Sequence, residues 1–459
     1  MLCCCRHQYL KTMRTTYEDE KQFECIGTYA TVREAQQQAT RELELLCKEK
    51  GLGKFWDGGE KKCAPVSFVL PKNKMNEHLG EWKQRVLFSY YNHPLRRHGR
   101  RIGRCLTLLL NEAKRLIPST EILSTQCTMR FVRRWNKWFQ EIGSKDDLEL
   151  WELDVKEMFP NMDRDEVFQS IKDFGALVQK ARGKRGREPN FAINKLDRKL
   201  DRLGTGYSEY YYNFSMADVI AFCEFDIYHN DIFYVGSRVF RQRRGLAIGG
   251  TGSAQMASIC LFMSEHKGQS CLPPLALDEG GQHPCDLPVH PFRFRDNLVG
   301  VKHRSTPIEC IQRGFEHIYG IPLQVENVGP TLTSLESDLY LARDATGINF
   351  VGARMACKTS LPDTPGKFKY RYPEPHVPHA RRTVASLVPA EAKRAIYYRV
   401  TEHDLHSNVR GVVATFERKG YPTSWWKPLL RERLHRWGVR LEDCYEDQSL
   451  IVLNQPLRT

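Results

Sequence analysis

The sequence has few of the features that mark secreted or membrane proteins. Its 15 cysteines form no C-x-x-C pair, and their odd number and irregular spacing argue against a disulfide or zinc framework. No apolar segment has the character of a secretory signal or of a spanning helix. We therefore expect reduced thiols, no membrane partner and an intracellular protein, with Cys3, Cys4 and Cys5 as incidental residues of a frayed start.

Negative charge is also scarce. The chain has 55 Asp and Glu residues against 69 Lys and Arg residues, which gives a formal net charge of +14. Such a surplus favours a polyanionic partner, because lysine and arginine displace counterions from phosphates. With 459 residues, 41% of them hydrophobic, the chain is long enough for two to four domain-sized units. Composition therefore predicts a globular protein that binds nucleic acid.

The first third of the chain predicts helices around a pair of strands. Residues 1–60 are expected to form a helical extension, with a helix at 31–51 that begins at a capping box. Strands are expected at 64–72 and 83–90. A run of arginines follows, and we expect it to face phosphates: Arg96, Arg97, Arg100 and Arg101. Aromatic residues at helical spacing then predict a core-facing helix: Phe131, Trp135, Trp138 and Phe139.

The later parts of the chain alternate between regular and irregular segments. Residues 179–206 are a basic insert, interpreted as an exposed arm with some helix, and residues 268–291 are expected to form a long loop. Prolines across 361–380 indicate a linker. The pattern of 381–440 predicts a small, separate helical unit.

Two distant acidic segments carry the chemistry. Asp154 lies near the end of an alternating run at 148–155, in which Leu150, Glu152 and Asp154 share one face. Asp296 and Asn297 are expected to occupy a tight turn between two short strands, at 292–295 and 298–301. Two aspartates on neighbouring strands can hold a pair of divalent cations, which is what nucleotidyl transfer requires.

Between the two acidic segments lies a glycine-rich stretch, residues 242–257, which begins at Gln242. Glycines let the backbone approach a ligand closely, and a helix that begins near Ser253 would direct its amides towards that ligand. A plain glycine turn before a buried helix would explain the stretch equally well on its own. The flanking aspartates favour the functional interpretation.

This order of motifs resembles reverse transcriptases, and among them Penelope-like and telomerase-like enzymes most, over about residues 64–430. Asp154 with Phe159 is similar to the first palm motif, residues 242–257 to the second, and 294–297 to the aromatic-x-Asp-Asp box. The resemblance implies an α+β right-hand polymerase fold, with an antiparallel palm sheet, packed helices, fingers and a helical thumb. The implied fingers are residues 61–145, the palm 146–350 and the linker with thumb 351–459.

The resemblance also implies a role for each matching residue. Two Mg²⁺ ions, or Mn²⁺ in their place, would be bound by Asp154, Asp296, Asn297 and the backbone carbonyl of Val155. Asp154 and Asp296 would be the catalytic residues. The incoming dNTP would be contacted by Lys83, Arg85, Phe159, Gln242 and Gly249, with Phe159 as a gate against the ribose 2′-hydroxyl. The partners would be an RNA template and a DNA primer, in the nucleus rather than the cytoplasm.

The sequence departs from the family pattern at three places. Asn297 replaces the second aspartate of the box, which removes one negative charge and is expected to weaken metal binding or slow the reaction. On this basis Asn297→Asp is expected to preserve or raise activity. The turn at 250–253 is looser than the family's Gly-Ser-Pro, and no GIY-YIG-like endonuclease follows the thumb, so the primer end would need another source.

Other functions stay open at this point. Some RNA-dependent RNA polymerases carry Asp-Asn in the hairpin, but they usually place an aspartate where this chain has Phe159, which favours DNA synthesis. A weakened retroelement remnant that binds nucleic acid without catalysis is a second alternative, motivated by Asn297. A metal-dependent nuclease is the weakest, because nucleases rarely need a Gln-Gly motif between their carboxylates.

Overall fold

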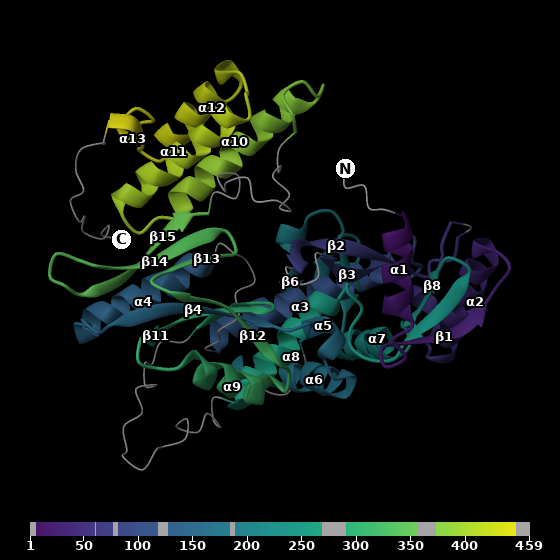
Figure 1. Cartoon of the computed structure of the whole chain (residues 1–459). Coiled ribbons are helices and arrows are strands. Elements are labelled where there is room, and N and C mark those ends of the chain that lie inside the picture. The colour runs from purple at the N-terminus through teal and green to yellow at the C-terminus, as the bar shows by residue number, and fades with distance from the viewer. Residues whose placement is uncertain are drawn as a thin grey trace, which may run out of the picture. The chain divides into compact units, whose positions relative to one another are not determined.

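The computed structural model describes residues 6–59, 61–76, 81–117, 127–183, 189–268, 291–356 and 373–446 (Figure 1). The chain divides into two compact units. The first unit contains residues 1–121, 155–272 and 316–322, and the second contains residues 122–154, 273–315 and 323–459. Within the described ranges, no helix is both long enough and apolar enough to cross a membrane.

The first unit is built on a five-stranded sheet. Its strand order is β1 (Phe23–Thr28), β9 (Arg238–Gln242), β8 (Ile232–Val235), β2 (Val66–Asn76) and β3 (Glu81–Ser89). The expected strand pair is thus confirmed, since β2 and β3 run antiparallel with Val66 opposite Ser89. Strand β1 was not predicted from the sequence; it pairs with β9 and so brings the N-terminal segment into this sheet. Buried aromatic rings cover one region of the sheet: Tyr17, Phe23, Phe88, Phe233 and Phe240.

Helices complete the first unit. They are α1 (Arg6–Tyr17), α2 (Val32–Glu49), α3 (Arg96–Leu116), α6 (Arg164–Ala181), α7 (Met216–Tyr228) and α8 (Ser253–Gly268). The predicted capping box is present at α2, where Thr31 and Glu34 bond each other's backbone amides. Helix α8 begins at Ser253 as expected and is buried almost throughout, which explains its uncharged sequence. Short helical turns also occur: η1 (Gly53–Phe55) and α5 (Met158–Asn161).

The basic insert forms a small sheet. Strand β5 (Phe191–Asn194) lies between β6 (Arg202–Leu203) and β7 (Tyr211–Phe214), and all of the pairs are antiparallel. The expected helix is present at the end of α6 and in the short η3 (Arg198–Leu200), and residues 195–200 are exposed as expected. The paired strands were not expected, and they make this part of the insert a small sheet instead of an arm. The four residues of β5 are all buried, which gives the insert a hydrophobic floor.

The second unit contains two antiparallel sheets. One has the order β10 (Phe292–Phe294), β11 (Asn297–His303), β4 (Leu148–Val155) and β12 (Leu323–Gly329). The other consists of β13 (Thr331–Ser334), β14 (Ser337–Arg343) and β15 (Asn349–Met355). The aromatic helix was predicted correctly: it is α4 (Thr128–Ile142), and Phe131, Trp135 and Phe139 are buried. Helix α9 (Ile308–Tyr319) follows β11 in the chain.

The C-terminal helices are α10 (Ala380–Tyr397), α11 (Glu402–Arg418), α12 (Thr423–His435) and α13 (Asp443–Glu446). Their helical character was predicted, but their separateness was not confirmed. A single hydrophobic cluster joins them to α4 and to both sheets of the second unit, through residues such as Val412, Trp135 and Val299. The side chain of Asn408 also accepts a hydrogen bond from the amide of Met355 at 2.7 Å. The predicted linker at 361–380 lies largely outside the described residues.

Candidate active site

Strands β4 and β11 bring the two acidic segments together. In their antiparallel register Asp154 lies directly opposite Asn297, and Leu153 lies opposite Leu298. Residues that face each other across an antiparallel pair project to the same side of the sheet, so Asp154 and Asn297 share one face. Asp154, Asp296 and Asn297 are all half-buried, which leaves them accessible to a ligand.

The hairpin that carries Asp296 turns one residue earlier than expected. Its turn consists of Arg295 and Asp296 alone, whereas Asn297 already belongs to β11, opposite Phe294. The predicted Asp296–Asn297 turn is therefore displaced by one residue. Arg295 takes the left-handed backbone conformation, with φ at 60°, which costs a residue other than glycine about 1 kcal/mol. The guanidinium of the fully buried Arg293 supports this turn by donating to the carbonyl of Arg295 at 3.0 Å.

Glu152 is a third carboxylate on the face that Asp154 and Asn297 share. It is 7% exposed and lies two residues before Asp154, so both side chains leave β4 on the same side. The amide nitrogen of Asn297 donates to Glu152 Oε1 at 3.4 Å, and the hydroxyl of the buried Ser334 donates to the same oxygen at 2.5 Å. These contacts direct the amide nitrogen of Asn297 towards Glu152.

The opposite face of the same strands is filled by packing and one ion pair. A Cβ atom on Gly300 would lie 2.3 Å from the ring of Trp151, so the strand can approach that ring only with glycine at this position. Lys302, 5% exposed, donates to Glu149 at 2.7 Å, which satisfies a buried ammonium group. This face therefore fixes the register in which Asp154 meets Asn297.

The side chains of Asp154, Asp296 and Asn297 offer oxygen donors, which are the ligand type that Mg²⁺ prefers. In the described part of the chain, no three side chains of His, Cys, Asp or Glu are grouped so that they could hold a metal ion alone. Mg²⁺ commonly binds to one or two carboxylates and takes its other ligands from substrate phosphates and water. The carboxylates of Asp154 and Asp296, with the amide of Asn297, fit that pattern.

In the first unit, the glycine-rich turn contacts the backbone that follows the first acidic motif. The amide of Leu246 donates to the carbonyl of Phe159 at 2.8 Å. At the neighbouring Gly245, with φ at 72°, a Cβ atom would lie 2.5 Å from the carbonyl oxygens of Phe159 and Pro160. Glycine is therefore required at this position by both conformation and space. The half-buried Phe159 thus has a fixed backbone position.

The same turn also contacts strand β3. The amide of Phe88 donates to the carbonyl of Ile248 at 3.0 Å. At Gly249, with φ at 108°, a Cβ atom would lie 2.5 Å from the carbonyl oxygen of Phe88. Glycine at position 249 therefore lets the turn lie against β3. This packing is a structural reason for glycine at a position that was expected to shape the nucleotide pocket.

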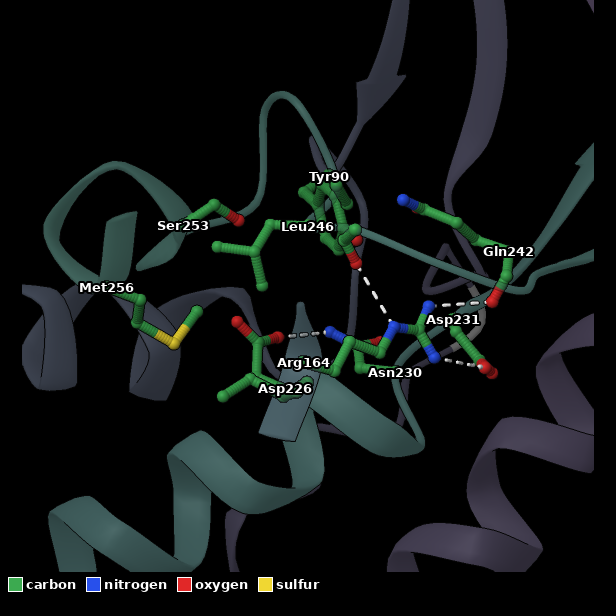
Figure 2. Close-up of a pocket in the computed structure, with 12 residues that line it drawn as sticks. Tyr90, Arg164, Asp226, Asn230, Asp231, Gln242, Leu246, Ser253 and Met256 are labelled. Atoms are coloured by element: carbon green, nitrogen blue, oxygen red, sulfur yellow. Dashed lines mark hydrogen bonds and ion pairs between the residues drawn. The ribbon is translucent and has the colours of Figure 1, made fainter. Parts of the chain in front are cut away.

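Arg164 connects the parts of this region. It begins α6 directly after the helix cap Asp163, and its guanidinium enters a small polar pocket (Figure 2). There it donates to the carbonyl oxygens of Gln242 at 2.7 Å and Gly245 at 3.1 Å, and it lies 3.4 Å from the Asp231 carboxylate. A cation in the first turn of a helix is disfavoured by the helix dipole. The three acceptors around the guanidinium therefore explain why Arg164 is stable at this position.

Two carboxylates of the pocket are perturbed by burial. Burial raises the pKa of Asp231, although the nearby guanidinium of Arg164 partly offsets that rise. Burial also raises the pKa of Asp226 to about 6, although that carboxylate accepts a hydrogen bond from the Asn230 amide at 2.6 Å. Figure 2 shows Asp226 and Asp231 on either side of Arg164. The pocket therefore supports the turn and is not itself a nucleotide cavity, since its small interior is already occupied by these side chains.

The expected nucleotide contacts lie on different elements of the first unit. Arg85 is exposed on β3, and the backbone of Lys83 belongs to the same strand, although its side chain is outside the described atoms. Gln242, 6% exposed, ends β9, and its side-chain amide donates to the carbonyl of Arg244 at 2.8 Å. Gln242 thus shapes the turn through its backbone and a local hydrogen bond, and a direct contact with substrate stays a prediction.

The arginine cluster begins α3. Arg97 is 74% exposed on its side chain and lies 3.7 Å from Asp57, while Arg100 is also exposed. Arg96 donates to the carbonyl of Tyr91, and Arg101 lies over the ring of Tyr212 with its central carbon 3.5 Å from the ring centre. The cluster therefore presents cations to solvent, whereas its role in binding phosphates stays a prediction.

No role was predicted from the sequence for Glu152 of the second unit or for Arg164 of the first. Glu152 could have been found from the strand alternation, which places it on the Asp154 face. Arg164 had a weaker signal, namely a cation next to a helix cap where an anion is favoured. Its contacts with residues 242 and 245 depend on the tertiary fold and have no local signature.

Comparison with known proteins supports the fold. No family model matches the sequence, and no curated protein matches it either. The fold is similar to that of apo telomerase from Candida tropicalis, with a TM-score of 0.50 at 10% identity over 94% of this chain and 63% of that one. Telomerase from Candida albicans, in complex with a fragment of telomeric RNA, gives 0.47 at 10% identity over 78% and 56%. The RNA-dependent RNA polymerase of a human picobirnavirus gives 0.48 at 11% identity over 95% and 79%.

These similarities bear on the fold alone. The match to the Candida tropicalis telomerase confirms a polymerase-like mixed α and β fold with antiparallel sheets. The chain spans 56% to 63% of the length of these telomerase chains. The division into fingers, palm and thumb stays a prediction, as do the substrates.

Proposed function

We propose that the chain is a reverse transcriptase of retroelement origin, which copies an RNA template by adding dNTPs to a primer 3′-hydroxyl. The observation that carries the proposal is the strand register that sets Asp154 opposite Asn297, next to the Asp296 turn. Two acidic segments distant in sequence thereby meet on one sheet, as the nucleotidyl-transfer chemistry requires. The similarity of the fold to a telomerase supports the same interpretation.

Mg²⁺ is the cofactor that fits these donors. Asp154, Asp296, the side-chain oxygen of Asn297 and the backbone carbonyl of Val155 are hard oxygen ligands of the type that Mg²⁺ prefers, and Mn²⁺ accepts the same set. When bound, a pair of such ions neutralises the charge that develops on the attacking and leaving oxygens.

The residues of the chain would then position the reactants. The primer 3′-oxygen bonds to the α-phosphorus, the bond to the β-phosphate oxygen breaks, pyrophosphate leaves, and the hydroxyl proton is lost to solvent. Arg85 and Lys83 both belong to β3, and their positive charges would neutralise the triphosphate. Phe159 would exclude the ribose 2′-hydroxyl, because its backbone is held by Leu246 and its ring is only half-buried.

Primer extension tests the proposal directly. Purified protein is given an RNA template, an annealed primer, and either dNTPs or rNTPs with Mg²⁺ or Mn²⁺. We expect extension with dNTPs, and we expect Asp154→Asn and Asp296→Asn to abolish it while primer–template binding stays within about two-fold. Normal extension by either variant would disprove the catalytic assignment.

The same assay separates the alternatives. A clear preference for rNTPs would identify an RNA-dependent RNA polymerase, which the Asp296-Asn297 pair of the hairpin also permits. Retention of primer–template without extension under any condition would identify a nucleic-acid-binding remnant. Both outcomes leave the fold unchanged and alter only the chemistry assigned to it.

A further inference from the structure

The small sheet of the first unit carries an unusual set of exposed tyrosines. Tyr207 is 81% exposed, Tyr210 is 54% exposed and Tyr212 is 37% exposed, all within or just before β7. Soluble proteins can expose single aromatic residues, but a group on one short segment marks an interaction site more often. We call these three residues, together with Lys195 and Arg101, the tyrosine surface.

Two cations lie at one ring of this surface. The central carbon of the Arg101 guanidinium lies 3.5 Å from the centre of the Tyr212 ring, and the Lys195 ammonium lies 5.2 Å from the same ring. Aromatic rings and cations that lie close together can stack on planar groups and attract anions at the same time.

Hydrogen bonds hold the backbone that carries the tyrosine surface in place. Arg104 of α3 forms two hydrogen bonds with the Asp201 carboxylate and donates to the carbonyl of Asn194 at 2.9 Å. Asn213 and Gly206 exchange two hydrogen bonds, at 2.8 Å and 2.9 Å, which close the loop that carries Tyr207 and Tyr210. The tyrosines are therefore presented on an ordered support, which lowers the entropy cost of binding a partner.

The accessible charge of the region is positive. Residues 191–214 contain Lys195, Arg198, Lys199 and Arg202 against Asp197, Asp201 and Glu209. Asp201 is paired with Arg104, and Asp197 accepts a hydrogen bond from the amide of Lys199. The arginines at the start of α3, of which Arg101 is one, add further positive charge. A partner of this surface should therefore carry negative charge along its length.

We propose that the tyrosine surface binds single-stranded nucleic acid, with tyrosine rings stacked on unpaired bases and the neighbouring arginines against phosphates. A duplex would satisfy the charge but hides its base faces, and an acidic peptide offers charge without planar rings. Binding of this kind does not require polymerase activity. Arg97 and Arg100 are exposed on the same helix as Arg101 and would extend the phosphate contacts.

Fluorescence anisotropy with the full chain tests the proposal. The probes are labelled single-stranded RNA and DNA of about 12 nucleotides, a matching duplex, and unlabelled poly-glutamate as competitor. We expect Tyr207→Ala with Tyr210→Ala to weaken single-strand binding at least five-fold, and the Tyr→Phe pair to bind within about two-fold of the parent. Arg100→Ala is expected to reduce the slope of log K against log salt by about 0.7.

Trp437→Ala is the matched control, since that aromatic residue is 59% exposed in the second unit and should leave binding unchanged. Both tyrosines are exposed, so thermal unfolding of the alanine pair is expected to match that of the parent. Loss with RNA, with DNA or with both supports the proposal. Undiminished binding by the alanine pair, equal losses for duplex and single strand, or efficient competition by poly-glutamate would overturn it. None of these outcomes depends on primer extension.

Discussion

The side-chain amide of Asn297 donates a hydrogen bond to Glu152 at 3.4 Å. This contact is a structural reason for asparagine, rather than aspartate, at position 297 of the hairpin. Glu152 is buried and also accepts the hydroxyl of Ser334 at 2.5 Å. An aspartate at position 297 would set two carboxylates side by side in a poorly hydrated place, where like charges repel strongly. The sequence predicts that Asn297→Asp preserves or raises activity, and the contact with Glu152 reverses that expectation.

We therefore predict that Asn297→Asp lowers primer extension at least ten-fold, which corresponds to about 1.4 kcal/mol. Glu152→Gln alone should have a small effect, because a glutamine oxygen can still accept from Asn297 and Ser334. The double variant should recover most of the activity, since the side-chain amide introduced by Glu152→Gln can donate to the new carboxylate. Steady-state rates for the four proteins form a double-mutant cycle, and a coupling energy near zero would show that Glu152 does not position residue 297.

Gly245 should tolerate no side chain. We predict that Gly245→Ala destabilises the protein by about 2 kcal/mol or more, because its Cβ atom would meet two carbonyl oxygens at 2.5 Å and its φ is positive. Gly51→Ala is the matched control, since Gly51 has a φ of 70° with nothing within 4 Å of the added atom. Urea unfolding of both variants isolates the steric part. Equal losses would mean that the turn relaxes away from Phe159.

Phe159 should determine the choice of sugar. Replacing its ring with alanine opens space at the gate while the hydrogen bond from Leu246 keeps the backbone in place. We expect Phe159→Ala to reduce the preference for dNTP over rNTP, measured as a ratio of kcat/KM values, by about ten-fold or more. Phe159→Tyr preserves the ring and serves as the control. An unchanged ratio in the alanine variant would remove Phe159 from the assignment.

How well the sequence predicted each structural feature depends on how far apart in the chain the interacting residues lie. Strand β4 and the hairpin could be predicted because alternation and turn residues are local signals, although the strained Arg295 displaced the turn by one residue. Strand β1 was missed because its partner, β9, is more than two hundred residues further on, with Phe23 opposite Gln242. The alternation of β4 places Glu152 on the Asp154 face, but its contacts with Asn297 and Ser334, like those of Arg164, depend on the fold.

Arg164 should be essential for the glycine-rich turn. We predict that Arg164→Met destabilises the protein by about 3–5 kcal/mol, because it removes the nearer of two cations from the buried Asp231 carboxylate and the donor from two carbonyl oxygens. Arg241→Met is the matched control, since Arg241 is 42% exposed and lies 3.8 Å from Asp231. Its loss should cost less than about 1 kcal/mol. Adding Asp231→Asn to Arg164→Met should restore part of the stability, and urea unfolding measures all four proteins.

Asp226 should make stability depend on pH. Its pKa rises to about 6 in the folded protein from an ordinary value of 3.8, so the folded state holds a proton that the unfolded chain releases. The contribution to stability is therefore complete below pH 3.8 and is lost as the pH rises through 6. A rise of this size corresponds to about 3 kcal/mol, and partial solvent access reduces this to roughly 1–3 kcal/mol.

Asp226→Asn keeps an oxygen for the Asn230 amide and removes the titration. We expect the difference in unfolding free energy between this variant and the parent to shift in favour of the variant between pH 4 and 7, and a constant difference would show that Asp226 titrates normally.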